Sequence, residues 1–352
     1  MGQRGSNKPD VERYLKGRKR ETEHRANVLA KRERQKKAVL GEEAPPADNT
    51  LTGTILTRAK SGLMVQADHD ESHHWCRYPQ KGRGAMPVPG DRVSFLPQTE
   101  TTDGWVEEIL ERKNLLRRWS FGRIKEIASN MEQVLILATP EEPVVHPRLV
   151  DRMLVGASVG KMDALIVVNK IDLIGMDTAL EWSKPWRMAG YDVLHISAET
   201  GEGLEVLHGR LRNRVSLLAG ASGVGKSTVL NRLIEDLDLD TSAISEATGR
   251  GVHTTSFTRL FPVPGGGVVA DSPGVREFHP VLDDPKELEK HFHEIGSRSG
   301  ECAYTHCLHR EDSDGCAVRA AVENGEIHPL RYESYQILYT SLLEGPLRGR
   351  GR

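Results

Sequence analysis

The chain has 352 residues, of which 38% are hydrophobic and 28% are charged, and its formal net charge is -2. At roughly 100–200 residues per domain, this length predicts two or three domains with cores of ordinary size. The sequence contains neither an apolar run of the ~18 residues that cross a bilayer nor the apolar N-terminal stretch of a signal peptide. Three of the four cysteines lie close together near the C-terminus, which argues against a disulfide scaffold. We therefore expect a globular cytoplasmic protein without membrane contact.

The N-terminal segment is strongly basic. Residues 1–40 hold 13 of the 48 Lys and Arg residues but only 5 of the 50 Asp and Glu residues. A segment so charged and so poor in apolar residues cannot bury enough surface to fold alone. It is either a solvated tail or, as we favour, an arm whose cations neutralise RNA phosphates. With the linker GEEAPPADNT, it forms a basic flexible arm over residues 1–50.

Short segments of alternating hydrophobicity follow over residues 51–118. LTGTILTR, GLMVQAD, DRVSFLP and GWVEEIL are separated by turn-forming Gly, Pro and Asp. Strands this short and this evenly spaced predict a small antiparallel β-barrel of the OB-fold kind. Such barrels commonly bind nucleic acid. A purely structural barrel remains the alternative, because the segment has few aromatic residues on which bases could stack.

The pattern changes from residue 119, where apolar runs alternate with stretches of helical length. Strands are predicted at 133–139, 163–169, 191–197, 214–220, 258–263 and 267–271, and helices at 147–158, 178–189, 202–212 and 226–235. Continuous apolar strands with helical crossovers predict a mainly parallel sheet covered on both faces. We assign this α/β domain to residues 119–282. Ligands of such sheets bind beyond the carboxyl ends of the strands.

The stretch GASGVGKST fits the phosphate-binding pattern GxxxxGK[ST] and lies between a predicted strand and a predicted helix, which is the context that the motif requires. Its backbone N–H groups and the helix N-terminus attract phosphates, Lys226 reaches the β and γ oxygens, and Ser227 ligates Mg²⁺. The predicted phosphate-binding residues are Gly220, Ala221, Ser222, Gly223, Val224, Gly225, Lys226, Ser227 and Thr228.

Two further motifs predict the base. NKID ends one predicted strand, and the Asp172 carboxylate can accept hydrogen bonds from the N1–H and the amino group of guanine, whereas adenine would leave this charge unpaired. We expect Asn169 to support the loop and N7, and the stem of Lys170 to cover the ring. SAETGEGL ends the next strand, where Ser197 and Ala198 are placed to offer backbone N–H groups to O6.

The last two motifs concern Mg²⁺ and the γ-phosphate. DSPG ends the final strand, where Asp271 can hold Mg²⁺ through water and the Gly274 N–H can sense the γ-phosphate. GRGVHTTS supplies Thr254 and Thr255, one of which is expected to complete the Mg²⁺ shell, and the sequence leaves open which.

All five guanine-nucleotide motifs are present, but their order is unusual. NKID precedes the phosphate-binding loop, whereas in ordinary GTPases it follows that loop. Because domain termini commonly lie close together, the same sheet can be threaded from a different start. The sequence therefore predicts a circularly permuted P-loop GTPase domain in which DSPG leads directly into the C-terminal region.

The C-terminal residues 283–352 are predicted to form a small α-helical zinc-binding domain. Cys302, Cys307, His309 and Cys316 offer three thiolates and one imidazole, a closed tetrahedral set that suits structural Zn²⁺, with His306 as an alternative ligand. Helices are predicted in DPKELEKHFHEI, with Asp284 as N-cap, and in PLRYESYQILYTSLLE. So few helices make a small core, and we expect the metal to hold the subdomain together.

These motifs together resemble the RsgA (YjeQ) family of circularly permuted GTPases. The resemblance rests on PGDRV, ERKNLLRR, GASGVGKS, DSPGVREF and the Cys/Cys/His/Cys tail, and it covers nearly the whole chain. Six residues separate His309 from Cys316, one more than in the family pattern. The resemblance implies an OB-fold, a GTPase domain and a zinc domain. It also implies GTP hydrolysis in late maturation of the small (30S) ribosomal subunit, stimulation by that subunit, and contact with 16S rRNA. We expect a monomer.

The catalytic group is the least defined part of the prediction. Ordinary GTPases orient the attacking water with a Gln after DxxG, where this chain has Val275, so we expect slow intrinsic turnover. The resemblance implies His253 as the substitute, with a solvated loop histidine as the alternative. The leading function is GTP hydrolysis that drives release from the 30S subunit. The alternatives are a nucleotide-gated RNA-binding module and a GTPase that acts on another RNA or on a translation factor.

Overall fold

The fold was analysed in a computed structural model, which describes residues 49–59, 61–78, 86–120, 122–234, 258–272, 278–310 and 312–344. The predicted basic arm up to residue 48 lies outside the described residues. So do four predicted site residues, namely His253, Thr254, Thr255 and Gly274.

The predicted α/β domain is confirmed. Its sheet has the strand order β10-β9-β8-β11-β13-β12, in which every adjacent pair is parallel except β12 with β13. All six residues of the central strand β8 are buried, which explains the uninterrupted apolar run QVLILA. The strands are β8 (Gln133–Ala138), β9 (Asp163–Val168), β10 (Asp192–His195), β11 (Val215–Gly220), β12 (Arg259–Pro262) and β13 (Val268–Asp271).

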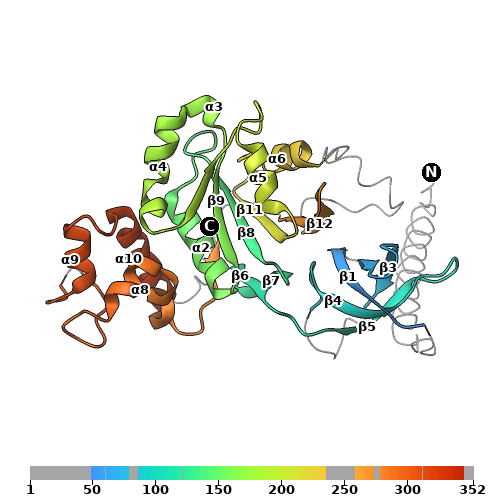
Figure 1. The fold of residues 1–352 in the computed structure, drawn as a ribbon. Coiled ribbons are helices and arrows are strands. Elements are labelled where there is room, and N and C mark those ends of the chain that lie inside the picture. Colours follow the sequence, from blue (N-terminus) through green and yellow to red (C-terminus); the bar gives the residue numbers. More distant parts are fainter. Residues whose placement is uncertain are drawn as a thin grey trace, which may run out of the picture. The chain divides into compact units, whose positions relative to one another are not determined.

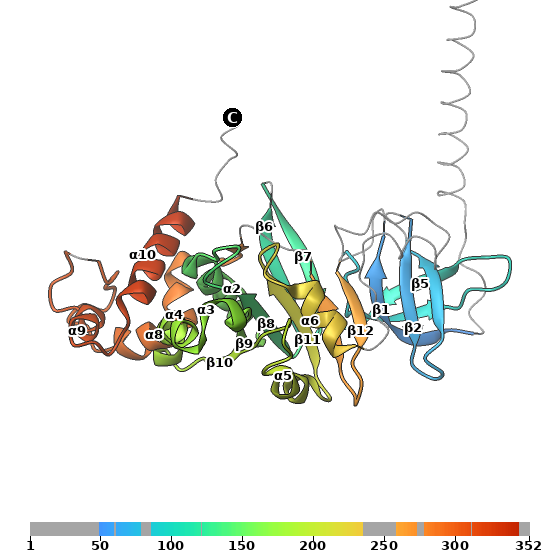
Figure 2. The ribbon, with the colours of Figure 1, turned by 90° about the horizontal axis from the view of Figure 1, so that it is seen from above.

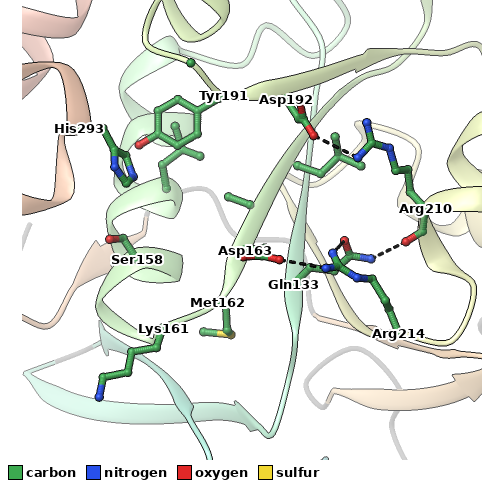
Figure 3. Close-up of a pocket in the computed structure, with 14 residues that line it drawn as sticks. Gln133, Ser158, Lys161, Met162, Asp163, Tyr191, Asp192, Arg210, Arg214 and His293 are labelled. Atoms are coloured by element: carbon green, nitrogen blue, oxygen red, sulfur yellow. Dashed lines mark hydrogen bonds and ion pairs between the residues drawn. The ribbon is translucent and has the colours of Figure 1, made fainter.

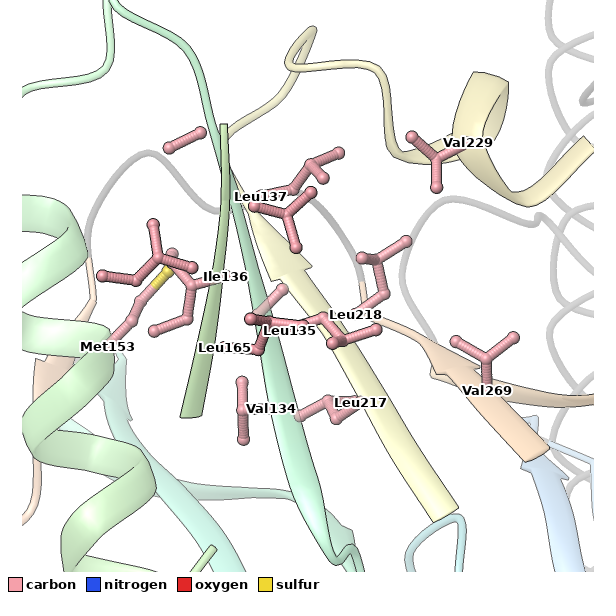
Figure 4. Packing of buried hydrophobic residues seen from close by; sticks show 14 of the residues in the cluster. Val134, Leu135, Ile136, Leu137, Met153, Leu165, Leu217, Leu218, Val229 and Val269 are labelled. Atoms are coloured by element: carbon pink, nitrogen blue, oxygen red, sulfur yellow. The ribbon is translucent and has the colours of Figure 1, made fainter. Parts of the chain in front are cut away.

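Helices cover both faces of this sheet. Figure 1 shows α2 and α4 on one face and α5 and α6 on the other. Figure 4 shows the packing behind this arrangement: Ile136 lies beside Met153 of α2, while Leu137 and Leu218 lie on the side of Val229 in α6. The predicted helices are thus confirmed as α2 (Pro147–Val159), α4 (Met176–Met188), α5 (Leu204–Leu211) and α6 (Lys226–Leu233), and a short α3 (Ile171–Ile174) precedes α4.

The predicted OB-type barrel is also confirmed, with one difference: an antiparallel barrel was predicted, but its strands β3 and β5 pair in parallel. Its strands pair in the closed cycle β1-β2-β3-β5-β4-β1 (Figure 2). Alternation along β2 places Leu63, Val65 and Ala67 in the barrel core while Met64 and Gln66 stay partly exposed. The barrel strands are β1 (Leu51–Arg58), β2 (Leu63–Ala67), β3 (His73–Arg77), β4 (Arg92–Leu96) and β5 (Gly104–Ile109).

The turn PGD at residues 89–91, before β4, is buried and is held by polar contacts. The Asp91 carboxylate is fully buried and accepts hydrogen bonds from Val88 N (2.8 Å), from Arg112 Nε (2.7 Å) and from Ser129 Oγ (2.5 Å). The preceding Gly90 has φ +90°, and a Cβ there would lie 2.1 Å from Ser129 O. Only glycine therefore permits this approach.

A second sheet, which the sequence analysis did not predict, has the order β14-β6-β7. It consists of β6 (Leu115–Ser120), β7 (Arg123–Ser129) and β14 (His279–Pro280). The hairpin β6–β7 is local, but β14 is remote in sequence and has only two residues. Its pairing with Arg118 and Trp119 therefore gives no periodic signal that a sequence could show.

The C-terminal region is helical, as predicted, with one difference. The segment DPKELEKHFHEI is not one α-helix but a 3₁₀-helix η1 (Pro285–His291) followed by α8 (His293–Ser299), with the Asp284 side chain accepting from Lys286 N as the predicted cap. Leu288, Phe292 and Ile295 pack with side chains of α9 (Ala317–Glu323) and α10 (Pro329–Leu343) into a separate core. Among the described helices none is long and apolar enough to span a membrane.

Arg331 on α10 lies in a buried charge cluster. It is 1% exposed and donates to Asp151 Oδ1 of α2 at 2.5 Å and to Glu294 Oε1 of α8 at 2.6 Å. Burial lowers the pKa of the guanidinium, but the two carboxylates outweigh burial and the pKa is raised overall. Trp186 of α4 also donates to Asp151, so the cluster ties the C-terminal helices to the α/β domain.

We predict that Arg331→Met shifts the urea unfolding midpoint strongly to lower urea, because it leaves the buried Asp151 carboxylate and the largely buried Glu294 carboxylate without this cationic partner, at a cost of ~3–5 kcal/mol. The matched control is Arg148→Met, since the Arg148–Glu333 pair is exposed and such pairs contribute ~0–1 kcal/mol. Equal midpoints for the two variants would contradict this role of the cluster.

Candidate functional site

Of the five predicted nucleotide motifs, the four that the structure describes in whole or in part meet at one edge of the main sheet. NKID follows β9, the SAE loop follows β10, the phosphate-binding loop follows β11, and Asp271 ends β13. These four strands are parallel, so their carboxyl ends lie at the same edge. Segments that are far apart in the chain thereby become neighbours in space.

Asn169 joins three of these loops. Its side chain is 1% exposed; Nδ2 donates to Val224 O of the phosphate-binding loop at 2.9 Å, and Oδ1 accepts from Ala198 N at 3.0 Å. Gly225 has φ +95°, and a Cβ at this position would lie 2.4 Å from Asn169 Nδ2. Gly225 therefore permits both the positive φ of the turn and the close approach of the Asn169 side chain.

The predicted base-reading motif NKID is also held by contacts within the protein. Ser197 Oγ donates to Asp172 Oδ1 at 2.6 Å, which leaves the second carboxylate oxygen of the exposed Asp172 available to a ligand. Ser197 N donates to Glu202 O and Ala198 N to Asn169 Oδ1, so both predicted O6 donors have partners inside the protein.

A loop that the sequence analysis did not assign to the site also reaches it. Lys170 Nζ donates to Glu142 O in the loop after β8, and a Cβ on Gly223 would lie 3.4 Å from Pro143 Cδ. This loop contains no recognisable motif. Its place at the site could have been predicted only from its position directly after a parallel strand, whose carboxyl end lies at the same edge of the sheet.

The phosphate-binding loop has the backbone that its sequence predicts. Gly220, Gly223 and Gly225 all have positive φ, and α6 begins at Lys226. Lys226 is 9% exposed and its Nζ donates to Gly220 O (3.1 Å) and Ala221 O (2.7 Å). The ammonium thus lies over the loop, and the exposed Ser227 and Thr228 follow it in the first turn of the helix.

Asp271 faces Lys226 across this site. Burial raises the pKa of the Asp271 carboxyl to about 6, although the Lys226 charge acts in the opposite direction. Burial likewise lowers the pKa of Lys226, against the attraction of Asp271. Asp271 Oδ1 is buried and has no hydrogen-bond partner within the described residues. An unpaired buried carboxylate oxygen beside a phosphate-binding loop is suited to a cation or to its water.

Cys302, Cys307, His309 and Cys316 form a cluster that could hold one metal ion. Their ligand atoms lie within 4.8 Å of one another, and His306 is not among them. The site is formed by the segment between α8 and α9, with Cys316 as the residue before α9. Burial raises the pKa of the Cys316 thiol to about 11. Because cysteine ligates metals as the thiolate, metal binding to this cluster is coupled to proton release.

A cavity of about 580 Å³ lies at the opposite, amino end of the strands (Figure 3). Figure 3 shows that two arginines of its wall are already paired: Arg210 forms an ion pair with Asp192 and Arg214 with Asp163, both at 3.1 Å. The cavity shares no lining residue with the nucleotide motifs. Its size alone therefore does not indicate a ligand site.

Comparison with known proteins identifies the family. A family model described as RsgA GTPase matches residues 109–280. A relative from Chlorobaculum parvum is 41% identical over 313 residues, covering 84% of this chain and 100% of its own. The chain belongs to the RsgA GTPase family. A relative from Gemmatimonas aurantiaca is 39% identical over 272 residues, with 76% and 88% of the two chains covered.

Solved structures agree with the RsgA fold. The crystal structure of YjeQ from Thermotoga maritima matches with a TM-score of 0.65 and 30% identity, over 84% of this chain and 99% of its own. YloQ, described as a circularly permuted GTPase, matches with a TM-score of 0.63 at 24% identity, over 86% and 98% of the two chains, and supports the fold alone. As a member of the RsgA family, this protein is a GTP-hydrolysing enzyme.

We predict that Asp271→Asn stabilises the nucleotide-free protein in a pH-dependent way. Because the pKa of Asp271 is raised in the folded protein, a protonated carboxyl favours the folded state. This contribution to the free energy of unfolding is fully present below pH ~3.8 and is lost as pH rises through about 6. The variant should therefore melt a few degrees above the wild type at pH 7–8, with the gain fading toward pH ~4. Asp163→Asn, at an exposed ion pair, is the control. A gain that is independent of pH would contradict the burial of this charge.

Proposed function

We propose that this GTPase acts in late maturation of the small (30S) ribosomal subunit, where GTP binding favours association and hydrolysis drives release. The observation that carries the proposal is the match to relatives named small ribosomal subunit biogenesis GTPase RsgA, one of them covered over its whole length. The strongly basic N-terminal segment and the OB-type barrel support contact with 16S rRNA.

For the base, the proposed roles follow from the contacts around Asn169. Asp172 accepts from N1–H and the amino group of guanine, with Ser197 Oγ fixing the carboxylate. Asn169 supports N7 while it holds Val224, and guanine O6 replaces Asn169 Oδ1 as the acceptor for Ala198 N. Lys170 covers the ring, and the Glu142 carbonyl fixes its ammonium.

The phosphates are proposed to bind to the backbone N–H groups of residues 220–228 and to the Lys226 ammonium. Ser227 and Asp271, whose Oδ1 has no hydrogen-bond partner within the described residues, are suited to Mg²⁺ bound with GTP, Asp271 acting through water. The ion neutralises charge on the phosphates. Thr254 or Thr255 completes its shell, the Gly274 N–H senses the γ-phosphate, and His253 orients the attacking water.

For the metal cluster, we propose one structural Zn²⁺. Three thiolates and one imidazole are the donors that this borderline-soft ion takes in closed tetrahedral sites. With four protein ligands there is no open position for catalysis, so the role is to hold the segment between α8 and α9 in place.

We predict that Asp172→Asn changes the base preference. The amide cannot accept both guanine donors, so affinity for GTP should fall by about 10²- to 10⁴-fold through the loss of two charge-assisted hydrogen bonds. The new N–H can instead donate to the 2-oxo group of xanthine, so affinity for XTP should rise. Displacement of a fluorescent nucleotide measures both affinities. Asp177→Asn, on the exposed first turn of α4, is the control. Unchanged GTP affinity in Asp172→Asn would contradict the assignment.

The ribosomal role is tested by GTPase rates with purified 30S, 50S and 70S particles. We predict stimulation by 30S alone, because hydrolysis is proposed to respond to that partner. His253→Ala should retain GTP binding, hydrolyse slowly, and stay on 30S particles during sedimentation in GTP. Normal release of this variant would favour a nucleotide-gated RNA-binding module instead. Failure of the wild type to sediment with 30S in a non-hydrolysable GTP analogue would point to a different RNA or factor.

A further inference from the structure

His309 presents one ring nitrogen to the thiols of the cluster. Its Nδ1 lies 3.6 Å from Cys302 Sγ and 3.5 Å from Cys316 Sγ, and the residue is 1% exposed. Nδ1 is therefore the nitrogen whose lone pair a metal among these thiols would use. The opposite nitrogen, Nε2, is directed out of the cluster.

The opposite nitrogen meets a carboxylate from a different element. His309 Nε2 lies 3.1 Å from Glu289 Oε2, in η1, whereas the four cluster residues all lie beyond α8. The Glu289 side chain is 31% exposed. It is thus partly shielded from water but not fully buried, and it is not a member of the Cys/His cluster.

The backbone of His309 is fixed independently of Glu289. Its carbonyl accepts from Tyr332 Oη at 2.5 Å and from Gln336 Nε2 at 2.7 Å, both on α10, and its φ is +52°. These contacts place the residue but do not involve its ring. The ring packs against Tyr335, with centroids 6.0 Å apart, and within the described residues Glu289 is the hydrogen-bond partner of Nε2, so this contact fixes which way the imidazole faces.

Glu289 is itself held firmly by its neighbours in η1. Leu288 is fully buried in the C-terminal core, and His291 Nδ1 lies 2.9 Å from Ser158 Oγ of α2. The carboxylate therefore approaches the imidazole from a segment that is anchored on both the C-terminal core and the α/β domain.

The chemistry of this contact selects one form of histidine. A neutral imidazole carries a proton on one nitrogen and a lone pair on the other, and an ionised carboxylate can only accept. A proton on Nε2 satisfies Glu289 and leaves the Nδ1 lone pair facing the thiols. A carboxylate in this position also makes the imidazole a stronger donor to a metal.

We propose that Glu289 is a positioning residue of the metal centre, which sets the tautomer and ring orientation of His309 without contacting the ion. This role rests on the zinc site proposed above. It predicts that zinc affinity depends on a residue outside the Cys/His set, in the segment that follows the DSPG motif.

The test is zinc affinity of the full-length protein, measured by competition with a chromophoric chelator at pH 7. Glu289→Ala should weaken binding about 10- to 100-fold, the usual effect of losing such a carboxylate. Glu289→Gln, which can still accept from Nε2–H but lacks the charge, should fall between Glu289→Ala and the wild type. Glu287→Ala is the matched control, because Glu287 lies on the same 3₁₀-helix and its carboxylate, within the described part of the chain, forms an exposed ion pair with Lys290 and does not contact the cluster.

A spectroscopic readout separates positioning from a general loss of structure. The visible absorption bands of the Co²⁺-loaded protein report ligand geometry, and they should shift in Glu289→Ala but not in Glu287→Ala. Zinc affinity within twofold of the wild type, together with unchanged cobalt bands, would overturn the role of Glu289 while leaving the zinc site intact. Absence of zinc binding in the wild type would overturn the zinc site, and the positioning role with it.

Discussion

The side chain of Asn169 is the contact on which the architecture of the nucleotide site depends. One amide donates to the phosphate-binding loop and accepts from the SAE loop, so three motifs share a single buried residue. Buried amides are costly to leave unpaired. Any displacement of one loop therefore affects the other two, and the missing Cβ of Gly225 is what allows the amide to come so close.

This arrangement explains why a reordered chain can form an ordinary site. The contacts depend on which strand ends lie together at the edge of the sheet, and not on the order in which the chain reaches them. The change in order has its consequence downstream. From Asp271 the chain continues through β14 and η1 to the Cys/His cluster, so the predicted Mg²⁺-binding Asp271 and the Glu289–His309 pair belong to one continuous segment.

Much of this could be predicted from the sequence because the signals are local. The apolar run at residues 133–138, the glycines of GASGVGKST and the spacing from Cys302 to Cys316 each predict a structure without knowledge of the rest of the chain. The sheet pairing of β14, the Glu142 carbonyl beside Lys170 and the Glu289 carboxylate beside His309 depend on residues that only folding brings together. The segment after Asp284 could be predicted in part. Its N-cap was predictable from the sequence, but its division into a 3₁₀-helix and α8 accompanies the tertiary packing of Leu288 and Phe292.

We propose that loops from separate parts of the chain form one site that distinguishes guanine from other purines. Displacement of a fluorescent GDP by unlabelled GDP, IDP and ADP tests this selectivity directly, because IDP lacks only the 2-amino group that Asp172 is proposed to accept from. We predict that IDP binds about 10- to 150-fold more weakly than GDP through the loss of one charge-assisted hydrogen bond, and that ADP binds more weakly still. Equal displacement by GDP and ADP would rule out guanine recognition at this site.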